Sequence, residues 1–165
     1  MPSDAVSLET GSMSEPAATR LADFLPYVLS VASNAVSGRV ADAYAREFGL
    51  RIPEWRVMAV LGDAGARTQR ELTTQTLMDK VAVNRACRAL EDRGLATRTA
   101  NERDGRSHHL ELTAEGQAMH GRIMPLALEM ERRMFEGFSA GERDTFRRLL
   151  ERVREAAGEI DADAR

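Results

Sequence analysis

The segment from residue 78 to residue 106 constrains the fold more than any other part of the chain. On a helical wheel that advances about 100° per residue, its first half places four apolar residues on one side. Their i, i+3, i+4, i+7 spacing is the signature of an amphipathic helix with one buried face. The apolar set is Val83, Ala86, Cys87 and Leu90. The opposite face carries Val81, Asn84, Arg85 and Arg88.

The outward face of this helix has the chemistry of a DNA-reading surface. Asparagine pairs with adenine and arginine with guanine, each through two hydrogen bonds to a base edge in the major groove. Lys80 adds a positive charge at the start of the helix. The same residues would also suit a surface helix whose charges are only solvated. The neighbouring segments must therefore decide between the two interpretations.

The segment before this helix predicts a second, shorter helix. Thr68 and Glu71 have the spacing of a capping box, in which each side chain bonds the other residue's backbone N–H group. We expect that helix to run to about Thr76. Asp79 is placed to cap the following helix, and Gly94 to end it. Two short helices joined by a tight connection form a helix-turn-helix, whose second helix is the one described above.

The segment after this helix predicts a β-hairpin. Residues 97–100 and 107–112 are two short extended runs, and Asp104-Gly105 between them is a strong turn signal. A hairpin directly after a helix-turn-helix is a wing. Its tip would present Arg103 and Arg106, followed by Ser107, and arginines on a protruding turn suit a narrow, electronegative minor groove.

Long amphipathic helices are expected at both ends, over residues 20–48 and 114–160. A winged helix-turn-helix, which we assign to residues 53–112, does not need them. Their apolar stripes would pack on each other or on a second subunit. We therefore expect one domain over residues 20–160, mainly α with a small wing, that forms a two-fold dimer with recognition helices about 34 Å apart. Residues 1–19 lack periodicity and are expected to be a disordered tail.

Two prolines and one glycine bear on the helix limits. Pro26 marks either the start of the first long helix or a kink in it. Pro53 is expected to lie in the first turn of the second helix, which we expect to end before Gly62.

The charge is distributed unevenly. The chain has a net charge of −3, yet residues 66–110 contain nine basic and six acidic residues. A local basic surface on an acidic protein indicates a polyanionic partner. The single cysteine excludes an intramolecular disulfide and fits a reducing compartment. With no membrane-length apolar run or signal peptide, we expect a soluble, cytoplasmic protein.

Several ordered motifs resemble the MarR family of bacterial transcription regulators. They extend from residue 48 to residue 116, and the resemblance as a whole covers about residues 21–153. The motifs are Phe48-Gly49-Leu50, Pro53-Glu54-Trp55-Arg56-Val57, Gln69-Arg70-Glu71-Leu72, Val83-Asn84-Arg85, Leu90-Glu91, Arg93-Gly94-Leu95, Asp104-Gly105-Arg106 and Leu112-Thr113 with Gly116.

The resemblance implies a homodimer, mostly a repressor, that loses DNA affinity when a small ligand binds or a cysteine is oxidised. It implies that Arg106 enters the minor groove, that Asp104 braces the wing by pairing with an arginine, and that Arg85 contacts the major-groove floor or a phosphate. This chain departs from the family where Asn84 replaces the usual Ser or Thr. It also departs where the His108-His109 pair occupies wing positions that are more often apolar.

The effector site is the least determined part of the prediction. In the family, ligands bind between the dimer helices and the DNA-binding lobe. Tyr44, Trp55 and Arg56 could line that cleft, where an arginine would suit a small aromatic acid or another carboxylate. For Trp55 alone, a core or junction role is favoured over stacking on a ligand. Arg56 is equally interpretable as a structural ion-pair partner.

Three classes of function remain open. The leading one is a sequence-specific DNA-binding regulator, released from a palindromic operator by a small molecule. The others are a winged-helix protein-interaction module and a metal- or redox-sensing regulator. Cys87 lies on the buried stripe, where thiols are usually inert. Adjacent strand residues such as His108 and His109 point to opposite faces and cannot readily share an ion with His120. No catalytic pair, metal-ligand cluster or cofactor motif is visible, so we expect neither an enzyme nor a bound cofactor.

Overall fold

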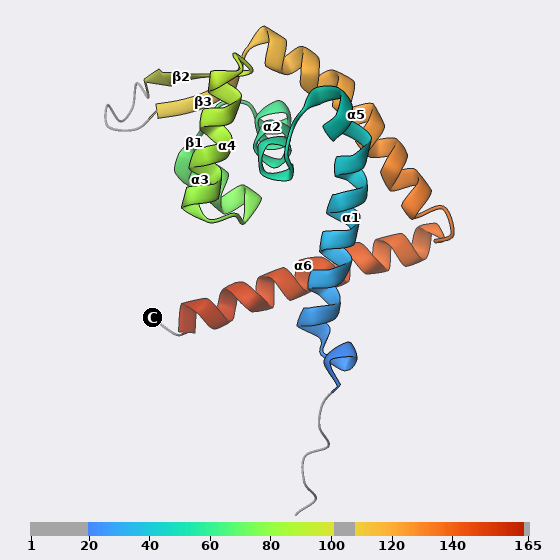
Figure 1. Ribbon diagram of the computed structural model, residues 1–165. Coiled ribbons are helices and arrows are strands. Elements are labelled where there is room, and N and C mark those ends of the chain that lie inside the picture. The colour runs from blue at the N-terminus through green and yellow to red at the C-terminus, as the bar shows by residue number, and fades with distance from the viewer. Residues whose placement is uncertain (1–19, 101–107, 164–165) are drawn as a thin grey trace, which may run out of the picture. The chain divides into compact units, whose positions relative to one another are not determined.

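A computed structural model describes residues 20–100 and 108–163 of the chain. It is mainly helical, with one small antiparallel sheet, which confirms the predicted fold class (Figure 1). The four wing-tip residues Arg103, Asp104, Arg106 and Ser107 lie outside the described residues, as does the predicted tail 1–19. No helix within the described ranges is both long and apolar enough to cross a membrane. The elements are a 3₁₀ turn (Leu21–Asp23), α1 (Leu25–Phe48), α2 (Ile52–Ala64), β1 (Arg67–Thr68), α3 (Gln69–Thr76), α4 (Lys80–Asp92), β2 (Ala96–Ala100), β3 (His108–Leu112), α5 (Ala114–Met134) and α6 (Ala140–Asp163).

The chain divides into two compact units, Met1–Val36 and Ser37–Arg165, and the boundary falls within α1. The described part of the first unit is the 3₁₀ turn and the first half of α1. Pro26 lies in the first turn of α1, where its missing N–H group costs no hydrogen bond. Of the two interpretations of Pro26, the structure thus supports a helix start.

The core of the second unit forms around α2. Trp55, Val57, Met58 and Leu61 of this helix are all buried, and α4 and α3 pack against it. The predicted stripe of α4, from Val83 to Leu90, is buried as well, which confirms the helical-wheel assignment. The rest of the core comes from the end of α1, α3, the sheet, α5 and the segments next to them: Tyr44, Phe48, Leu50, Leu72, Leu95, Ala96, Leu110, Leu112 and Ile123.

The ends of the two short helices follow the predicted capping chemistry. The Thr68 backbone N–H donates to Glu71 at 2.7 Å, and the Glu71 N–H donates back to Thr68 Oγ1 at 3.3 Å. Asp79 accepts the N–H of Ala82 at 2.8 Å and so caps α4. Gly94 follows α4 at φ +69°, a left-handed conformation that glycine adopts without steric cost. These local signals therefore position the helix-turn-helix as expected.

One predicted helix end is wrong. Pro53 does lie in the first turn of α2, but the helix continues through Gly62 to Ala64 and ends at Gly65, which has φ +74°. A glycine at position 62 is explained by packing and not by the end of the helix. A Cβ atom at this position would overlap the imidazole of His120, which packs against α2 from α5. The glycine therefore permits a close contact and does not end the helix.

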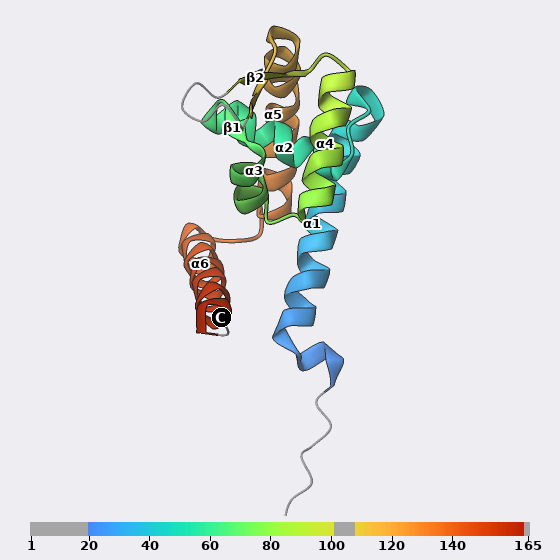
Figure 2. The same cartoon turned by 90° about the vertical axis from the view of Figure 1, so that its left-hand side faces the viewer.

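The sheet contains one strand more than predicted. Strands β2 and β3 form the expected antiparallel hairpin, with Arg98 opposite Leu110. The two-residue β1 pairs with the other edge of β3, with Thr68 opposite His109, and so the order is β1-β3-β2. A strand of two residues is too short to show alternation, which is why the sequence pattern missed it. Figure 2 shows β1 leading directly into α3.

The two C-terminal helices begin at side-chain caps. Thr113 accepts the N–H of Gly116 to start α5, and Ser139 forms a capping box with Glu142 to start α6. The start of α5 also touches the segment that follows α4. Thr113 donates its hydroxyl to the carbonyl of Gly94 at 2.7 Å and its N–H to the carbonyl of Leu95 at 3.1 Å.

A glycine-to-alanine pair in α5 tests this close approach. In Gly116→Ala the new Cβ would collide with the Leu95 carbonyl oxygen, so backbone must move, and we expect a loss of about 1–3 kcal/mol in the free energy of unfolding. Gly121 is the control, because a Cβ there meets no atom within 4 Å. Gly121→Ala should stabilise the helix by about 0.5–1 kcal/mol. Urea denaturation followed by circular dichroism measures both; equal effects of the two changes would contradict the contact.

Candidate nucleic-acid interface

The outward face of α4 presents the five residues that the sequence predicted for DNA binding. Lys80, Arg85 and Arg88 are exposed, Asn84 is half-buried, and the apolar Val81 is 58% exposed. They share one 13-residue helix whose opposite face is buried against α2 and α3. Because burial of the apolar stripe fixes the rotation of the helix about its axis, these side chains must face away from the core.

The connection between α3 and α4 is tight because one residue adopts an unusual conformation. Leu77 has φ +51°, in the left-handed region that costs a non-glycine residue roughly 1–2 kcal/mol. Its side chain is 75% exposed. Two residues later Asp79 starts α4, so the turn leaves the first residues of that helix at the surface.

The base of the wing is attached to α4 by an ion pair. Arg98 on β2 and Glu91 on α4 lie 2.9 Å apart between nitrogen and oxygen. On β3, His108 is exposed and His109 half-buried, while Leu110 is buried. The histidines therefore take the surface positions of this strand, next to the predicted wing tip.

The C-terminal end of α4 is attached to the end of α1. The Arg93 guanidinium donates to the carbonyl oxygen of Phe48 at 2.7 Å and to that of Gly49 at 3.1 Å. Arg122 of α5 holds the same end of α1. It forms an ion pair with Glu47, and its guanidinium carbon lies 4.7 Å from the centre of the Phe48 ring.

The three predicted effector residues form one cluster with two residues that the sequence did not indicate. Tyr44 and Trp55 are buried with ring centres 5.4 Å apart, and His120 stacks on Trp55 at 5.8 Å. Arg56 is half-buried and donates to Ser37 Oγ at 3.2 Å.

Burial dominates the ionisation of this cluster. It raises the pKa of Tyr44 to about 12, although the charge of Arg56 opposes the rise. It also lowers the pKa of His120, so that burial disfavours the charged imidazole. The cluster thus combines buried aromatic rings with neutral hydrogen-bonding groups and the half-buried cation Arg56.

Comparison with known proteins identifies the family. The MarR family profile matches residues 48–107. The HTH-type transcriptional repressor Rv2887 of Mycobacterium tuberculosis is 30% identical over 105 residues, which cover 64% of this chain and 76% of the repressor. The chain belongs to the MarR family. It is therefore a DNA-binding transcription regulator, as the helix-turn-helix and its motifs predicted.

Solved structures of MarR-like regulators share the fold. A probable transcriptional regulator from Pseudomonas aeruginosa is 29% identical with a TM-score of 0.70, covering 81% of this chain and 99% of its own. The PcaV regulator from Streptomyces coelicolor, solved with its natural ligand, is 25% identical with a TM-score of 0.75. That match covers 86% of this chain and 99% of PcaV.

Sequence reasoning missed three residues that the structure brings to these sites. His120 and Ser37 lie on α5 and α1, each at least 18 residues away in sequence from its partner in the aromatic cluster. Arg93 was noted only as part of a family motif. A glycine within α2, Gly62, was the one available signal for His120, because it marks a close approach of another element.

The metal- and redox-sensing alternatives depend on His120, His108, His109 and Cys87. Within residues 20–100 and 108–163, no three His, Cys, Asp or Glu side chains are grouped so that they could hold a metal ion. Cys87 is buried on the stripe of α4, and burial raises the pKa of its thiol to about 11.

Thiol labelling measures how well Cys87 is protected. Because the thiolate is the reactive form and the pKa is raised, DTNB should react with the folded protein at pH 7.5 far more slowly than with protein unfolded in urea. The rate should rise as the pH approaches 11. Rapid labelling of folded protein at pH 7.5 would contradict the buried position and favour a redox role.

Proposed function

We propose that this MarR-family protein binds a palindromic operator as a homodimer and represses transcription until a small molecule releases it. The observation that carries the proposal is the exposed face of α4, which gathers Asn84, Arg85 and Arg88 on a helix whose other face is locked into the core. Its relatives are transcriptional regulators, and we infer no catalytic activity.

Each residue of the α4 face is assigned a role from its chemistry. Asn84 and the two arginines would read base edges or contact phosphates, and Lys80 would contact a phosphate. Val81 would contact a thymine methyl group. In this assignment, Asn84 would form two hydrogen bonds with the edge of an adenine base. The wing residues Arg103, Asp104, Arg106 and Ser107 remain predicted contacts to the minor groove.

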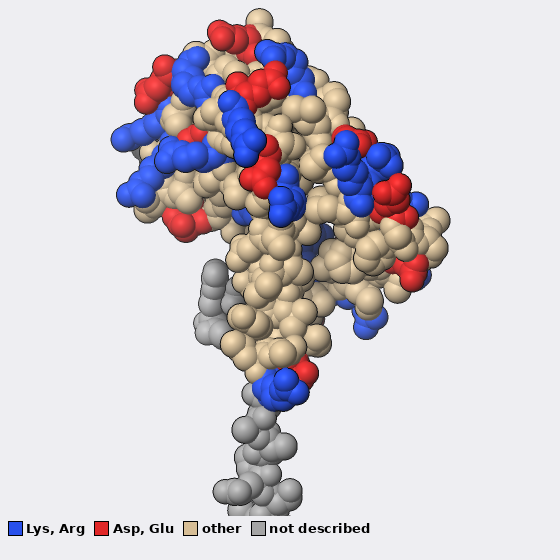
Figure 3. Space-filling view, turned by 45° about the vertical axis from the view of Figure 1, so that its right-hand side comes forward, with Lys and Arg blue, Asp and Glu red and all other residues tan. Residues whose placement is uncertain are grey.

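Apolar side chains on the surface of both units support the dimer. In the first unit, residues 24–36 contain no charged residue, and most of their large apolar side chains are exposed; this stretch is part of the tan region of Figure 3. In the second unit, Leu149 and Val153 of α6 are 49% and 52% exposed. Exposed apolar stripes of this kind usually mark a subunit interface.

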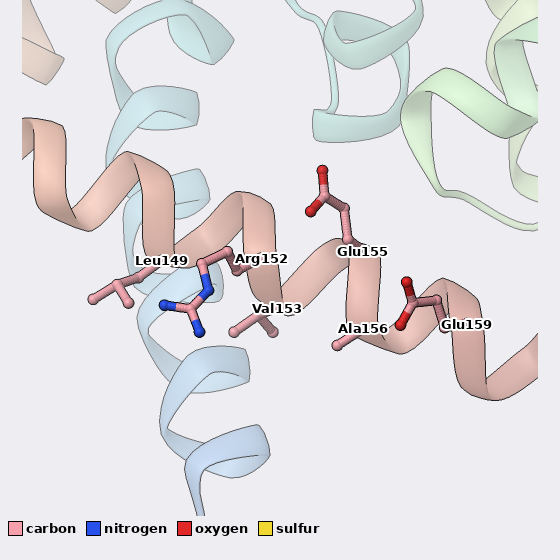
Figure 4. A pocket seen from close by; sticks show the side chains of 6 residues that line it. All are labelled: Leu149, Arg152, Val153, Glu155, Ala156 and Glu159. Carbon is pink, nitrogen blue, oxygen red and sulfur yellow. The ribbon is translucent and has the colours of Figure 1, made fainter.

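The surface of α6 also carries exposed apolar side chains along one side of the helix. Leu149, Val153 and Ala156 lie along one side of the helix, with Arg152 and Glu159 among them (Figure 4). They line an open hollow of about 420 Å³ whose walls come from this one helix. We therefore assign the hollow to the dimer surface. In this proposal residues 20–48 and 114–160 form the dimer and residues 53–112 the DNA-binding lobe, within one domain of residues 20–160.

DNA-binding titrations test the proposal. Fluorescence polarisation with a palindromic duplex selected by the wild-type protein from random DNA should show two chains per duplex and a steep loss of affinity with salt. Arg85→Ala should cost roughly 1–3 kcal/mol and relax base preference if Arg85 reads a base. Arg88→Ala should weaken binding and reduce the salt slope by about 1 if Arg88 contacts a phosphate.

Arg39→Ala is the matched control, because it removes one exposed arginine that pairs with Asp42 on the same helix, α1. Since α1 is assigned to the dimer, analytical ultracentrifugation first verifies that this variant is as dimeric as the wild type. It should leave operator affinity within about twofold of wild type. Binding that is absent, or that does not depend on salt, would contradict the proposal and favour a winged-helix interaction module.

We infer that the effector is a small aromatic carboxylate bound beside the Tyr44–Trp55 cluster. Arg56 supplies the cation for a carboxylate, and its present partner is the neutral Ser37 hydroxyl, which an anion could replace. The buried rings of Tyr44 and Trp55 would form the apolar wall beside Arg56. That the related PcaV was solved with a natural ligand supports a ligand-responsive regulator.

A thermal-shift comparison tests the effector assignment. Benzoate or 4-hydroxybenzoate should raise the melting temperature of the wild-type protein, with a stabilisation of about 2.7 kcal/mol at 100 times Kd. Benzamide should give a smaller shift, because it lacks the charge. Arg56→Gln should abolish the difference between the acid and the amide. Equal shifts of wild type and Arg56→Gln with benzoate would contradict a role for Arg56.

A further inference from the structure

Arg93 lies where the C-terminal ends of two helices meet. It is the residue that follows the last turn of α4, and its side chain reaches back across the sequence to the end of α1. There it donates to two successive carbonyl oxygens, those of Phe48 at 2.7 Å and Gly49 at 3.1 Å. This contact joins the helix that we assign to DNA reading to the helix that we assign to the dimer.

The electrostatics of the contact favour arginine. The carbonyl groups at a helix C-terminus carry a partial negative charge, and a cation there stabilises the helix. Arg93 is the C-cap residue of α4, and its guanidinium binds the carbonyl groups at the C-terminal end of α1. Its planar guanidinium supplies two donors in a fixed geometry, whereas a lysine ammonium is a single point charge on a flexible stem. An arginine can therefore hold both carbonyls in one fixed direction, whereas a lysine ammonium on its flexible stem would fix that direction less well.

The residues after Arg93 attach α5 to the same point. The carbonyls of Gly94 and Leu95 accept the Thr113 hydroxyl and N–H, and Gly116 packs on the Leu95 carbonyl. Arg122 of α5 in turn holds Glu47 and Phe48 at the end of α1. The end of α4 is thus connected to the end of α1 and to the start of α5 through one junction.

We propose that Arg93 is a positioning residue that sets the angle of α4 relative to α1 and α5, and thereby the half-site spacing that the dimer accepts. The inference rests on the proposed function. In a two-fold dimer the two recognition helices must match half-sites about 34–36 Å apart, or 10–10.5 base pairs. One inserted base pair therefore changes both the separation and the rotation of the half-sites.

A rigid junction should reject the wrong spacing, and a loosened junction should tolerate it. The experiment measures Kd by fluorescence polarisation for the selected palindrome and for the same duplex with one base pair inserted at its centre. The ratio of the two Kd values is the spacing discrimination. Partial unfolding reduces the active fraction equally on both duplexes and leaves the ratio unchanged, so a merely structural role would not alter it.

We expect the wild-type protein to discriminate at least tenfold against the inserted base pair. Arg93→Ala should reduce this ratio at least threefold, mainly because binding to the inserted duplex becomes relatively better. Arg93→Lys, which keeps the charge but loses the two-donor geometry, should also reduce the ratio and is the variant to use if Arg93→Ala binds too weakly to measure. Arg39→Ala, which removes an exposed arginine paired with Asp42 within α1, should keep the wild-type ratio when sedimentation shows it to be as dimeric as the wild type.

Two outcomes would overturn the inference, and they are distinguishable. If the wild-type protein discriminates and both Arg93 variants keep its ratio, the positioning role is wrong and the proposed function stands. If the wild-type protein binds no palindromic duplex, the proposed function fails, and the inference fails with it.

Discussion

Burial of the apolar stripe of α4 against α2 is the interaction on which the rest of the structure depends. Val83 and Leu90 have no accessible surface, and Ala86 and Cys87 almost none. Removing a Val or Leu side chain from water stabilises a fold by roughly 1.5–3 kcal/mol. Because this burial fixes the rotation of α4 about its axis, it also decides which residues face outward. The stability of the lobe and the proposed DNA-binding face are therefore consequences of the same helical pattern.

The two ends of α4 are secured by different means. Its N-terminus is capped locally, by Asp79 after the left-handed Leu77. Its C-terminus is held by contacts distant in sequence, which Arg93 makes to α1 and the Gly94 and Leu95 carbonyls make to Thr113. Helix α4 is thus started by local capping, whereas its orientation depends on tertiary contacts. The long helices carry exposed apolar side chains, which a second subunit would cover.

Predictions from the sequence succeeded where the signal was local. The capping residues Thr68 and Asp79 each accept the backbone hydrogen bond expected of them, because such bonds join groups three residues apart. The errors arose where the role of a residue depends on a contact with a residue far away in the sequence. Gly62 was interpreted as a helix end, but it accommodates His120 from α5. Strand β1 exists only because β3 pairs with it.

The sequence alone determined the helix-turn-helix, the hairpin after it and the five residues of the outward face of α4, since periodicity and capping are properties of neighbouring residues. It also brought Tyr44, Trp55 and Arg56 together as a candidate site. Only the tertiary structure decided that His120 stacks on Trp55 and that Arg93 holds the end of α1. Arg93 and Phe48 are 45 residues apart in the chain. No local pattern predicts such a contact, because only the tertiary fold brings the two groups within hydrogen-bonding distance.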